Sequence, residues 1–456
     1  MKIGFIVQRY GAEILGGSEY HCRLMAEHLS SLHSVEVLTT CAREYTTWEN
    51  AYPEGKDRVR GVTVRRFANA ETRDLEAFNA YSDWIFSNPH TAEDEQNWLR
   101  QQGPWCPALI EYLEREHGSY DALIFFTYLY APTVLGLQID PRRSILVPTA
   151  HDEPAIRLEL YKQVFSLPAA IAYNTTMERG FLRQRFSIKA KVQEIVGCGV
   201  DLPPGMDLSA VAYPVANSDE TPVDDDPSEA ASDNPVSDNG SGGVASARGA
   251  VFRRRHRLFG PFALYGGRID PGKGCEELIE YFSTYADEQG DATLALMGAK
   301  LMPLPDEPYV RFAGMLPEVE RLEALEAATV VVVPSPYESL SLLALESFAV
   351  GSPILANARS DVLTDHCQRS NAGLYYANRE EFVECLKLLM GDRELRVAMG
   401  RNGQAYVRQN YRWDVILEKY ERMITGVTGR RQSKGPSRPS RGRGRSGRPR
   451  SRARRG

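Results

Sequence analysis

The sequence predicts an α/β protein with two Rossmann-like domains, each built on a parallel sheet, that face each other across a cleft. Its 456 residues, of which 43% are hydrophobic and 25% charged, are enough for two domains of ordinary size and have a globular composition. In both halves of the chain, short apolar runs alternate with longer amphipathic stretches, which is the pattern of a doubly wound parallel sheet. Open α/β sheets bind ligands outside the carboxyl ends of their strands, so the cleft is the expected functional site.

The first domain is expected over residues 1–202. Seven short apolar runs predict its strands, and the stretch 18–31 predicts a helix with apolar side chains such as Tyr20 on one face. The most apolar window, residues 122–137, is interrupted by Thr127 and Pro132 before it reaches the ~20 residues of a membrane span. The predicted strands are residues 3–7, 35–39, 62–66, 122–126, 144–148, 170–173 and 192–196.

Residues 203–258 are expected to form an acidic, disordered linker or insertion. Residues 217–246 contain eight acidic residues and no basic residue, so this stretch has too little apolar surface to fold alone. A second α/β domain is expected over residues 259–403, and a helical stretch follows at residues 404–428. The strands predicted for the second domain are residues 262–265, 293–297, 310–313, 330–333, 353–356 and 373–376.

Charge is distributed unevenly along the chain. Residues 429–456 carry 12 basic residues and no acidic residue, which predicts a basic disordered tail, whereas the rest of the chain has a net charge of −18. A tail of this kind binds polyanions without sequence preference, or contacts anionic lipid. The acidic body has no aromatic and basic surface motif, so no specific nucleic acid is expected as a partner.

The strongest candidate site follows the run of four valines at residues 330–333. Proline residues end this predicted strand, and Ser339 is expected to cap a helix whose first turn is Leu340-Ser341-Leu342. Glu338 would then lie beside helix N–H groups, which bind phosphate oxygens, and Glu346 about two turns further along. Because carboxylates hold sugar hydroxyls by charge-assisted hydrogen bonds, the motif predicts a site for a sugar attached to phosphate. The alternative is a helix with one capping and one solvent-facing acid.

A glycine-rich loop, residues 265–274, follows the first predicted strand of the second domain. Its glycines allow close approach to a ligand, and its Arg268 and Lys273 can neutralise a diphosphate. The spacing matches neither a P-loop nor a dinucleotide fingerprint. The alternative is a glycine-rich turn with incidental surface charges.

Two features of the first domain are further candidates. Gly17 precedes the first helix, which is consistent either with a plain turn or with close approach of the backbone to a phosphate or an acceptor. His151 follows a predicted strand end with Asp152 and Glu153 beside it, so it either faces the cleft or has a structural role.

Together these positions resemble the family-four (group 1) retaining glycosyltransferases of the GT-B fold. The resemblance runs through most of residues 1–425 and implies a nucleotide-sugar donor on the second domain and an acceptor on the first. The residues that carry it are Gly16-Gly17, His151, Gly197-Cys-Gly-Val-Asp201, Gly267-Arg268, Lys273-Gly274, Phe312-Ala-Gly314, Pro334-Ser335, Glu338 and Glu346.

The resemblance implies a role for each residue of the donor site. Arg268 and Lys273, with the backbone of residues 340–342, would bind the donor diphosphate. Glu346 would hold the ribose hydroxyls, and Glu338 would contact the donor sugar.

The resemblance also implies that His151 lines the reaction centre, that Gly17 approaches the phosphate and that residues 404–428 cross back onto the first domain. The family's first Glu is often followed by Gly and an aromatic residue, whereas Ser339 and Leu340 stand here. This departure affects the shape of the sugar pocket more than phosphate binding by the backbone.

The expected function is metal-independent transfer of a sugar, with retention, from a nucleotide-diphosphate sugar to a glycan or lipid-linked acceptor in cell-surface glycan synthesis. No cofactor and no metal ligand are expected, because the two cations and the helix N–H groups can stabilise the leaving diphosphate. Alternatives are a nucleotide-sugar epimerase or a phosphorylase of the same fold, and a polyanion-binding protein acting through the tail.

The expected location is the cytoplasm, with contact between the basic tail and the anionic inner face of the membrane as an open possibility. The seven cysteines are odd in number and contain no Cys-x-x-Cys spacing, which favours free thiols in a reducing compartment.

Overall fold

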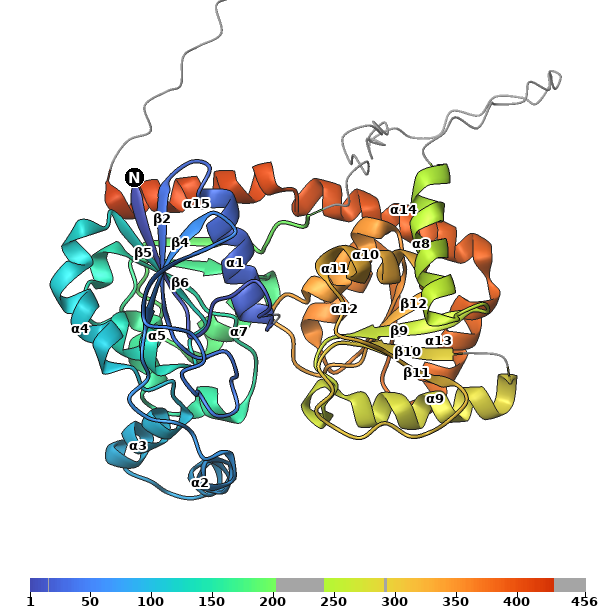
Figure 1. The fold of residues 1–456 in the computed structure, drawn as a ribbon, viewed down its shortest axis with the longest axis horizontal. Helices are drawn as coiled ribbons and strands as arrows, with labels where there is room; N and C mark the ends of the chain where they lie inside the picture. Colours follow the sequence, from blue (N-terminus) through green and yellow to red (C-terminus); the bar gives the residue numbers. More distant parts are fainter. Residues whose placement is uncertain (15, 202–241, 291–292, 430–456) are drawn as a thin grey trace, which may run out of the picture.

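The structure is a computed structural model that describes residues 1–14, 16–201, 242–290 and 293–429. Two α/β domains lie side by side, and the last helix passes from the second domain back over the first (Figure 1). The predicted fold class is confirmed, because each domain is built on a mainly parallel sheet.

Within the described residues, the first domain contains an eight-stranded sheet in the order β3-β4-β2-β1-β5-β6-β7-β8. Neighbouring strands are parallel except for β3 and β4, which form an antiparallel hairpin. Its strands are β1 (Lys2–Ile6), β2 (Ser34–Thr40), β3 (Gly55–Val59), β4 (Val62–Phe67), β5 (Ala122–Phe126), β6 (Ser144–Val147), β7 (Ala170–Tyr173) and β8 (Val192–Ile195).

All seven predicted strands of this domain are present, with ends that shift by one residue or less. The sequence did not predict β3, because Gly-Lys-Asp-Arg-Val is polar and its middle residues are exposed at the edge of the sheet. Its pairing with β4 depends on the turn between them, where Arg60 and Gly61 both have positive φ.

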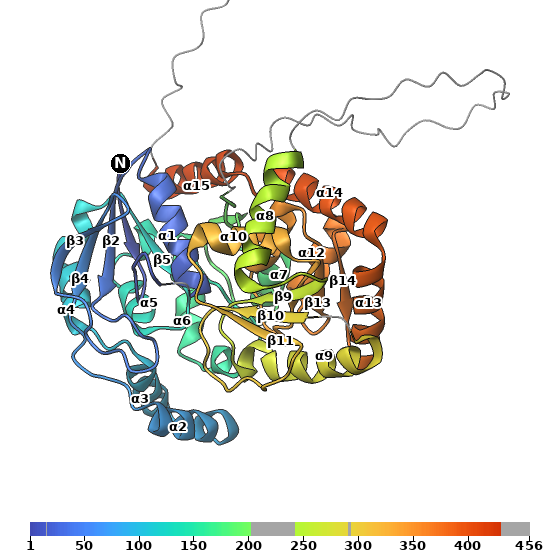
Figure 2. The same ribbon diagram turned by 45° about the vertical axis from the view of Figure 1, so that its right-hand side comes forward.

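Helices cover both faces of the first sheet, and the α2–α3 pair projects away from it at the lower end of the molecule (Figure 2). Trp98 of α3 is buried and donates its indole N–H to Ser82 of α2, so packing is the main role of this tryptophan. The helices are α1 (Gly17–Leu29), α2 (Leu75–Ser87), α3 (Ala92–Gln102), α4 (Pro107–Glu116), α5 (Ala131–Gly136), α6 (Tyr161–Ser166) and α7 (Thr176–Arg185).

The described part of the second domain contains a six-stranded, all-parallel sheet in the order β11-β10-β9-β12-β13-β14. The six predicted strands are all present, because each is a short, mostly apolar run between helical stretches. They are β9 (Phe262–Gly266), β10 (Thr293–Met297), β11 (Val310–Gly314), β12 (Val330–Val333), β13 (Ile354–Asn357) and β14 (Gly373–Tyr376).

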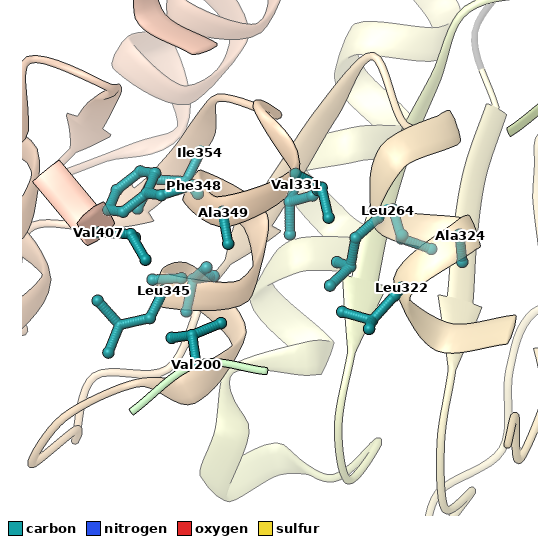
Figure 3. Packing of buried hydrophobic residues seen from close by; sticks show 14 of the residues in the cluster. Val200, Leu264, Leu322, Ala324, Val331, Leu345, Phe348, Ala349, Ile354 and Val407 are labelled. Carbon is teal, nitrogen blue, oxygen red and sulfur yellow. The ribbon is translucent and has the colours of Figure 1, made fainter. Parts of the chain in front are cut away.

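Helix α11 lies at the centre of the second domain's core. Its sequence, Leu-Leu-Ala-Leu-Glu-Ser-Phe-Ala-Val, is apolar on nearly every side, which is typical of a helix buried on more than one face. Figure 3 shows Leu345 and Phe348 of α11 beside Val407 of α14. The helices are α9 (Cys275–Gln289), α10 (Glu318–Ala327), α11 (Leu342–Val350), α12 (Asp361–Ser370), α13 (Arg379–Gly391) and α14 (Arg393–Asn410).

The prediction that residues 203–258 are disordered is partly wrong. Residues 242–256 form helix α8 (Gly242–His256), which packs against α10 (Figure 1). Phe252 is fully buried, and Arg253 donates to the carbonyl oxygens of Gly260 and Ala327. The second domain therefore extends further towards the N-terminus than residue 259. Residues 202–241 lie outside the described residues.

The expected return of the chain to the first domain is confirmed, although it involves two helices. After α14 the backbone turns at Tyr411, and α15 (Trp413–Thr428) then packs against β5, β6, β7 and β8. The two connections between the domains meet where Val200 N donates to the Tyr411 carbonyl oxygen, 3.0 Å away. Position 199, next to this contact, requires glycine, because a Cβ there would lie 2.4 Å from the Trp413 indole.

Among the described helices, none is both long and apolar enough to span a bilayer. The expected basic tail, residues 429–456, lies outside the described residues except for Gly429, which ends α15 with a positive φ.

Candidate active site

The carboxyl ends of the strands in the two sheets face each other at the domain boundary. The Arg268 guanidinium carbon lies 5.1 Å from the centre of the Tyr45 ring, and the rings of His151 and Tyr337 stack with their centroids 5.6 Å apart. These four residues follow β9, β2, β6 and β12, respectively. Loops at the functional edge of each parallel sheet therefore touch across the boundary.

The loop after β9 brings a cation to the loop after β12. Asp270 accepts a hydrogen bond of 2.8 Å from the backbone N–H of Lys273, which closes a short 3₁₀ turn. Gly274 follows with a φ of 75°, and a Cβ there would lie 2.5 Å from the Pro334 carbonyl oxygen. Only glycine permits this approach, which places Lys273 over the second loop.

Lys273 and Glu338, both predicted site residues, form an ion pair. The Lys273 ammonium lies 2.8 Å from Glu338 Oε1 and 3.4 Å from Ser335 Oγ. The other predicted cation, Arg268, lies 3.4 Å from Asp270 and points towards the first domain. In the part of the chain that the structure describes, no three His, Cys, Asp or Glu side chains gather into a possible metal site.

Helix α11 begins later than the sequence predicts. It starts at Leu342, and the residue before it, Ser341, adopts a left-handed φ of 61°. Leu340 and Ser341 are therefore in the turn rather than in the first helical turn, and Glu346 lies about one turn into the helix. The predicted cap by Ser339 is wrong as well, because its hydroxyl instead accepts a 3.3 Å hydrogen bond from Asn174 of the first domain.

The late start leaves a helix N-terminus at the domain boundary. The first N–H groups of any α-helix have no intrahelical acceptor. Within the described residues the Ser341 side chain makes no cap hydrogen bond to them. The N-terminus of α11 is therefore able to bind an anion with backbone N–H groups.

A buried histidine fixes the turn before α11. His366 of α12 donates from Nε2 to the Leu340 carbonyl oxygen over 2.8 Å and accepts at Nδ1 from the Tyr406 hydroxyl over 3.0 Å. Burial lowers the pKa of His366, which keeps the imidazole neutral with its proton on Nε2. The Tyr406 hydroxyl lies 3.4 Å from that of Tyr411, so the chain of contacts extends to the domain connection.

Glu346 is buried and bound to an arginine. Arg321 of α10 donates from Nη2 to Glu346 Oε1 over 2.8 Å and from Nη1 to Oε2. Tyr20 of α1, in the first domain, places its hydroxyl 3.5 Å from Oε1. Burial raises the pKa of the Glu346 carboxyl, and the Arg321 guanidinium lowers it again. The predicted ribose-binding carboxylate thus lies in an interdomain contact, bound to a guanidinium.

The loops after β6 and β7 are joined beneath His151 by a buried acid. Glu178 of α7 accepts from Ala150 N over 2.6 Å and from Asn174 N over 2.5 Å. Burial raises the pKa of Glu178 to about 8, against the lowering effect of these two N–H bonds. His151 itself lies 3.6 Å from Glu153 and stacks on Tyr337 of the second domain, while its role stays a prediction.

Gly17 is the first residue of α1. No described heavy atom lies within 4 Å of the place where a Cβ would stand, so the backbone here is open to approach. Beneath the loop, the buried Glu19 accepts from Arg9 Nε over 2.9 Å and from the Ser18 hydroxyl over 2.8 Å. Whether Gly17 contacts a phosphate stays a prediction.

Sequence reasoning did not identify Tyr20, Arg321, Tyr337 or His366 as site residues. Tyr20 was placed on the apolar face of its helix, and its ring is indeed buried. Its hydroxyl meets Glu346 across 326 positions of the chain, and no local pattern reports such a contact.

Comparison with known proteins finds a family match in the second domain. Residues 252–406 match the family model described as glycosyl transferases group 1. Over 305 residues the chain is 25% identical to the D-inositol 3-phosphate glycosyltransferase of Jonesia denitrificans, a match that covers 62% of this chain and 63% of that relative. The match therefore spans less than two thirds of the relative's length.

The likeness to solved structures extends over both domains. Sucrose-phosphate synthase from Thermosynechococcus elongatus has a TM-score of 0.63 at 17% identity, covering 94% of this chain and 99% of that one. Anabaena HepE in complex with UDP-glucose has a TM-score of 0.62 at 14% identity, covering 93% and 100%. The second domain is therefore similar to the group 1 glycosyltransferases, and the chain as a whole has the GT-B fold.

Proposed function

We propose that this protein transfers a sugar from a nucleotide-diphosphate sugar to a glycan or lipid-linked acceptor, with retention and without a metal ion, in cell-surface glycan synthesis. The observation that carries the proposal is the grouping of Lys273, Glu338 and the N-terminus of α11 at the carboxyl edge of the second sheet. A cation and free helix N–H groups suit a diphosphate, and a carboxylate suits sugar hydroxyls.

The donor would lie along the loops after β9 and β12. Lys273, Arg268 and the backbone of residues 340–342 would hold the diphosphate, and Glu346 would hold the ribose. In support, the matched relative from Jonesia denitrificans is named a glycosyltransferase, and the solved HepE structure contains UDP-glucose.

Donor binding would exchange the partner of Lys273. In the structure its ammonium is neutralised by Glu338, 2.8 Å away. A bound diphosphate offers a stronger anion, so Lys273 would turn to the phosphate and release Glu338 for the hydroxyls of the donor sugar. One binding event would in this way organise both halves of the donor site.

The reaction breaks the bond between the anomeric carbon and the diphosphate oxygen and forms a bond from that carbon to the acceptor oxygen. Negative charge grows on the leaving diphosphate, where Lys273, Arg268 and the α11 N–H groups would stabilise it. Retention follows if the acceptor attacks from the face that the diphosphate leaves, and the acceptor proton then passes to a phosphate oxygen. His151 would line the reaction centre on the first-domain side.

The direct test is product analysis with nucleotide sugars of the common bases and a panel of glycan and lipid acceptors. We expect a transferred sugar with the anomeric configuration of the donor, measured by NMR, and the same rate with and without a chelator. Glu338→Ala should abolish transfer, whereas Glu384→Ala, which breaks an exposed pair with Lys387, should leave it unchanged. An inverted product would overturn retention, whereas turnover of the donor alone would indicate the epimerase alternative and turnover with added phosphate the phosphorylase alternative.

The proposed location is the cytoplasm, with peripheral contact at the inner face of the membrane through residues 429–456, which contain 12 basic residues. Sedimentation with vesicles that contain anionic lipid should recover the full chain but not a variant that ends at Gly429. Equal recovery of both would refute the role of this segment.

A further inference from the structure

The Arg321–Glu346 pair belongs to an ionic cluster that spans both domains, and the Tyr20 hydroxyl joins this pair to Glu318. In the cluster, side chains of α1 and of the β3–β4 turn meet side chains of α10 and α11. Arg23 lies 3.6 Å from Glu318 and 3.7 Å from Glu27. The described members are three cations, Arg23, Arg60 and Arg321, and three anions, Glu27, Glu318 and Glu346.

The Arg321–Glu346 contact fixes the direction of the carboxylate. Two guanidinium nitrogens bind two carboxylate oxygens, an arrangement that sets the plane of both groups. An ionised carboxylate has about four acceptor positions, so Arg321 uses about half of them. About two acceptor positions therefore remain for other donors.

Tyr20 holds one of those remaining positions with a weak bond. Its hydroxyl accepts from Arg321 Nη2 over 3.0 Å and has two alternative acceptors for its own proton. These are Glu346 Oε1 at 3.5 Å and Glu318 Oε1 at 3.3 Å. Tyr20 can therefore give up Glu346 to another hydroxyl and still donate to Glu318, so the exchange leaves no buried polar group unpaired.

We propose that Arg321 is a positioning residue of the donor site, which aims the Glu346 carboxylate at the ribose diol, and that Tyr20 occupies the place of one ribose hydroxyl until the donor arrives. The proposal rests on the proposed function and adds how the carboxylate is prepared. Because Tyr20 belongs to the first domain, donor binding at Glu346 changes a contact between the domains.

The first experiment compares a nucleotide that has the diol with one that lacks it. Titration calorimetry gives the dissociation constants of UDP and GDP and of their 2′,3′-dideoxy counterparts, and the ratio of the two constants measures diol recognition. For the wild type we expect a ratio of about ten or more, because each hydrogen bond to a buried charge contributes about 1.5–3 kcal/mol. Glu346→Gln should reduce this ratio.

Arg321→Gln should lower the ratio by about tenfold while binding of the dideoxy nucleotide stays within about twofold. Arg321→Lys keeps the charge but presents a single ammonium, so it should also lower the ratio. This variant replaces Arg321→Gln in the test if the glutamine variant does not fold. The matched control is Arg255→Gln, which breaks an exposed pair with Glu320, next to Arg321 in the same helix. An unchanged ratio in both Arg321 variants would overturn the proposal.

A second readout separates positioning from general support of the fold. Without Arg321, the buried carboxylate takes up a proton at higher pH, so UDP binding by Arg321→Gln should weaken at a higher pH than in the wild type. The same shift should disappear in the Arg321→Gln/Glu346→Gln double variant. Among the described residues, the other titratable or charged groups that face Glu346 are Tyr20, Cys198, Asp201 and Glu318.

Tyr20→Phe tests the second half of the proposal. It removes the competing hydroxyl, so UDP should bind as tightly as to the wild type or tighter, and the diol ratio should be kept. A lower ratio would mean that Tyr20 helps to bind the ribose, which would contradict the proposal that it occupies the place of a ribose hydroxyl. If neither UDP nor GDP binds the wild type at all, the proposed function fails first, and this outcome is distinct from a normal wild-type ratio that the Arg321 variants leave unchanged.

Discussion

Among single residues, Lys273 has the most direct part in the proposed donor site, through an exchange of its partner. Its ammonium is paired with Glu338 in the structure and would turn to a diphosphate when one binds. Lys273→Ala should therefore weaken UDP or GDP binding by roughly ten- to a hundredfold, the value of one charge-assisted hydrogen bond. Binding of the nucleoside without phosphates should not change. Titration calorimetry measures both.

Lys387→Ala is the matched control, because Lys387 forms exposed pairs with Glu288 and Glu384 far from the site in sequence. Equal weakening by the two lysine variants, or an equal loss of nucleoside binding, would contradict the role of Lys273.

Single residues were predictable where a short motif carries them. Lys273 and Glu338 could be singled out because a glycine loop or a strand end precedes each of them by a few positions, and Glu346 because of its spacing from Glu338. Tyr20 and Arg321 could not, because their meeting with Glu346 depends on how α1, α10 and α11 come together. The sequence reports that Tyr20 is buried, but not what its hydroxyl contacts.

At the scale of elements, the start of α11 contains a strained serine. Ser341 has a φ of 61°, a region that costs an L-residue about 1 kcal/mol and glycine almost nothing. Ser341→Gly should therefore raise the free energy of unfolding by about 0.5–1 kcal/mol in urea denaturation. Ser30→Gly is the control, because Ser30 has an ordinary φ of −65° and should lose stability on this change. A less stable Ser341→Gly variant would contradict the strain.

Helix α1 carries a buried histidine that should make stability depend on pH. Burial lowers the pKa of His21 to about 4, against a backbone bond with Gly197 that raises it. In the unfolded chain the value is about 6.5, so between about pH 6.5 and about pH 4 only the unfolded chain takes up the proton. The free energy of unfolding should fall over this window as the pH is lowered.

His21→Gln removes this titration. Denaturation in urea at several pH values should show that the wild type loses more stability than the variant on acidification. Parallel pH profiles for the two proteins would refute the assignment.

Among the elements, the strands were predictable and several boundaries were not. A short apolar run between helical stretches usually forms a buried parallel strand, which is why thirteen of the described strands were predicted. The polar strand β3 and the helix α8 have no such signal, because one is held by a hairpin partner and the other by Phe252 in the core. Helix α11 starts late because Ser341 is left-handed, and helix propensity does not predict this conformation.

At the scale of the whole molecule, the first domain depends on a helix that comes last in the sequence. Ile416, Tyr420, Met423 and Ile424 of α15 are fully buried against the first sheet. Ile416→Ala should cost about 2–5 kcal/mol of stability. Hydrogen exchange should show faster exchange in β1, β5 and β6, with little change in β9 and β12. Equal effects in both sheets would contradict this division.

The proposed function requires that the second domain bind a nucleotide-diphosphate sugar without a metal ion. It is tested most directly by the thermal stability of the full chain with UDP, GDP, ADP and CMP and their common sugar conjugates, with and without a chelator. At about 100 times its dissociation constant a ligand stabilises the folded protein by ~2.7 kcal/mol. The account predicts stabilisation by the nucleotides of one base, unchanged by the chelator. A folded protein that none of them stabilises, or one whose stabilisation the chelator abolishes, would contradict it.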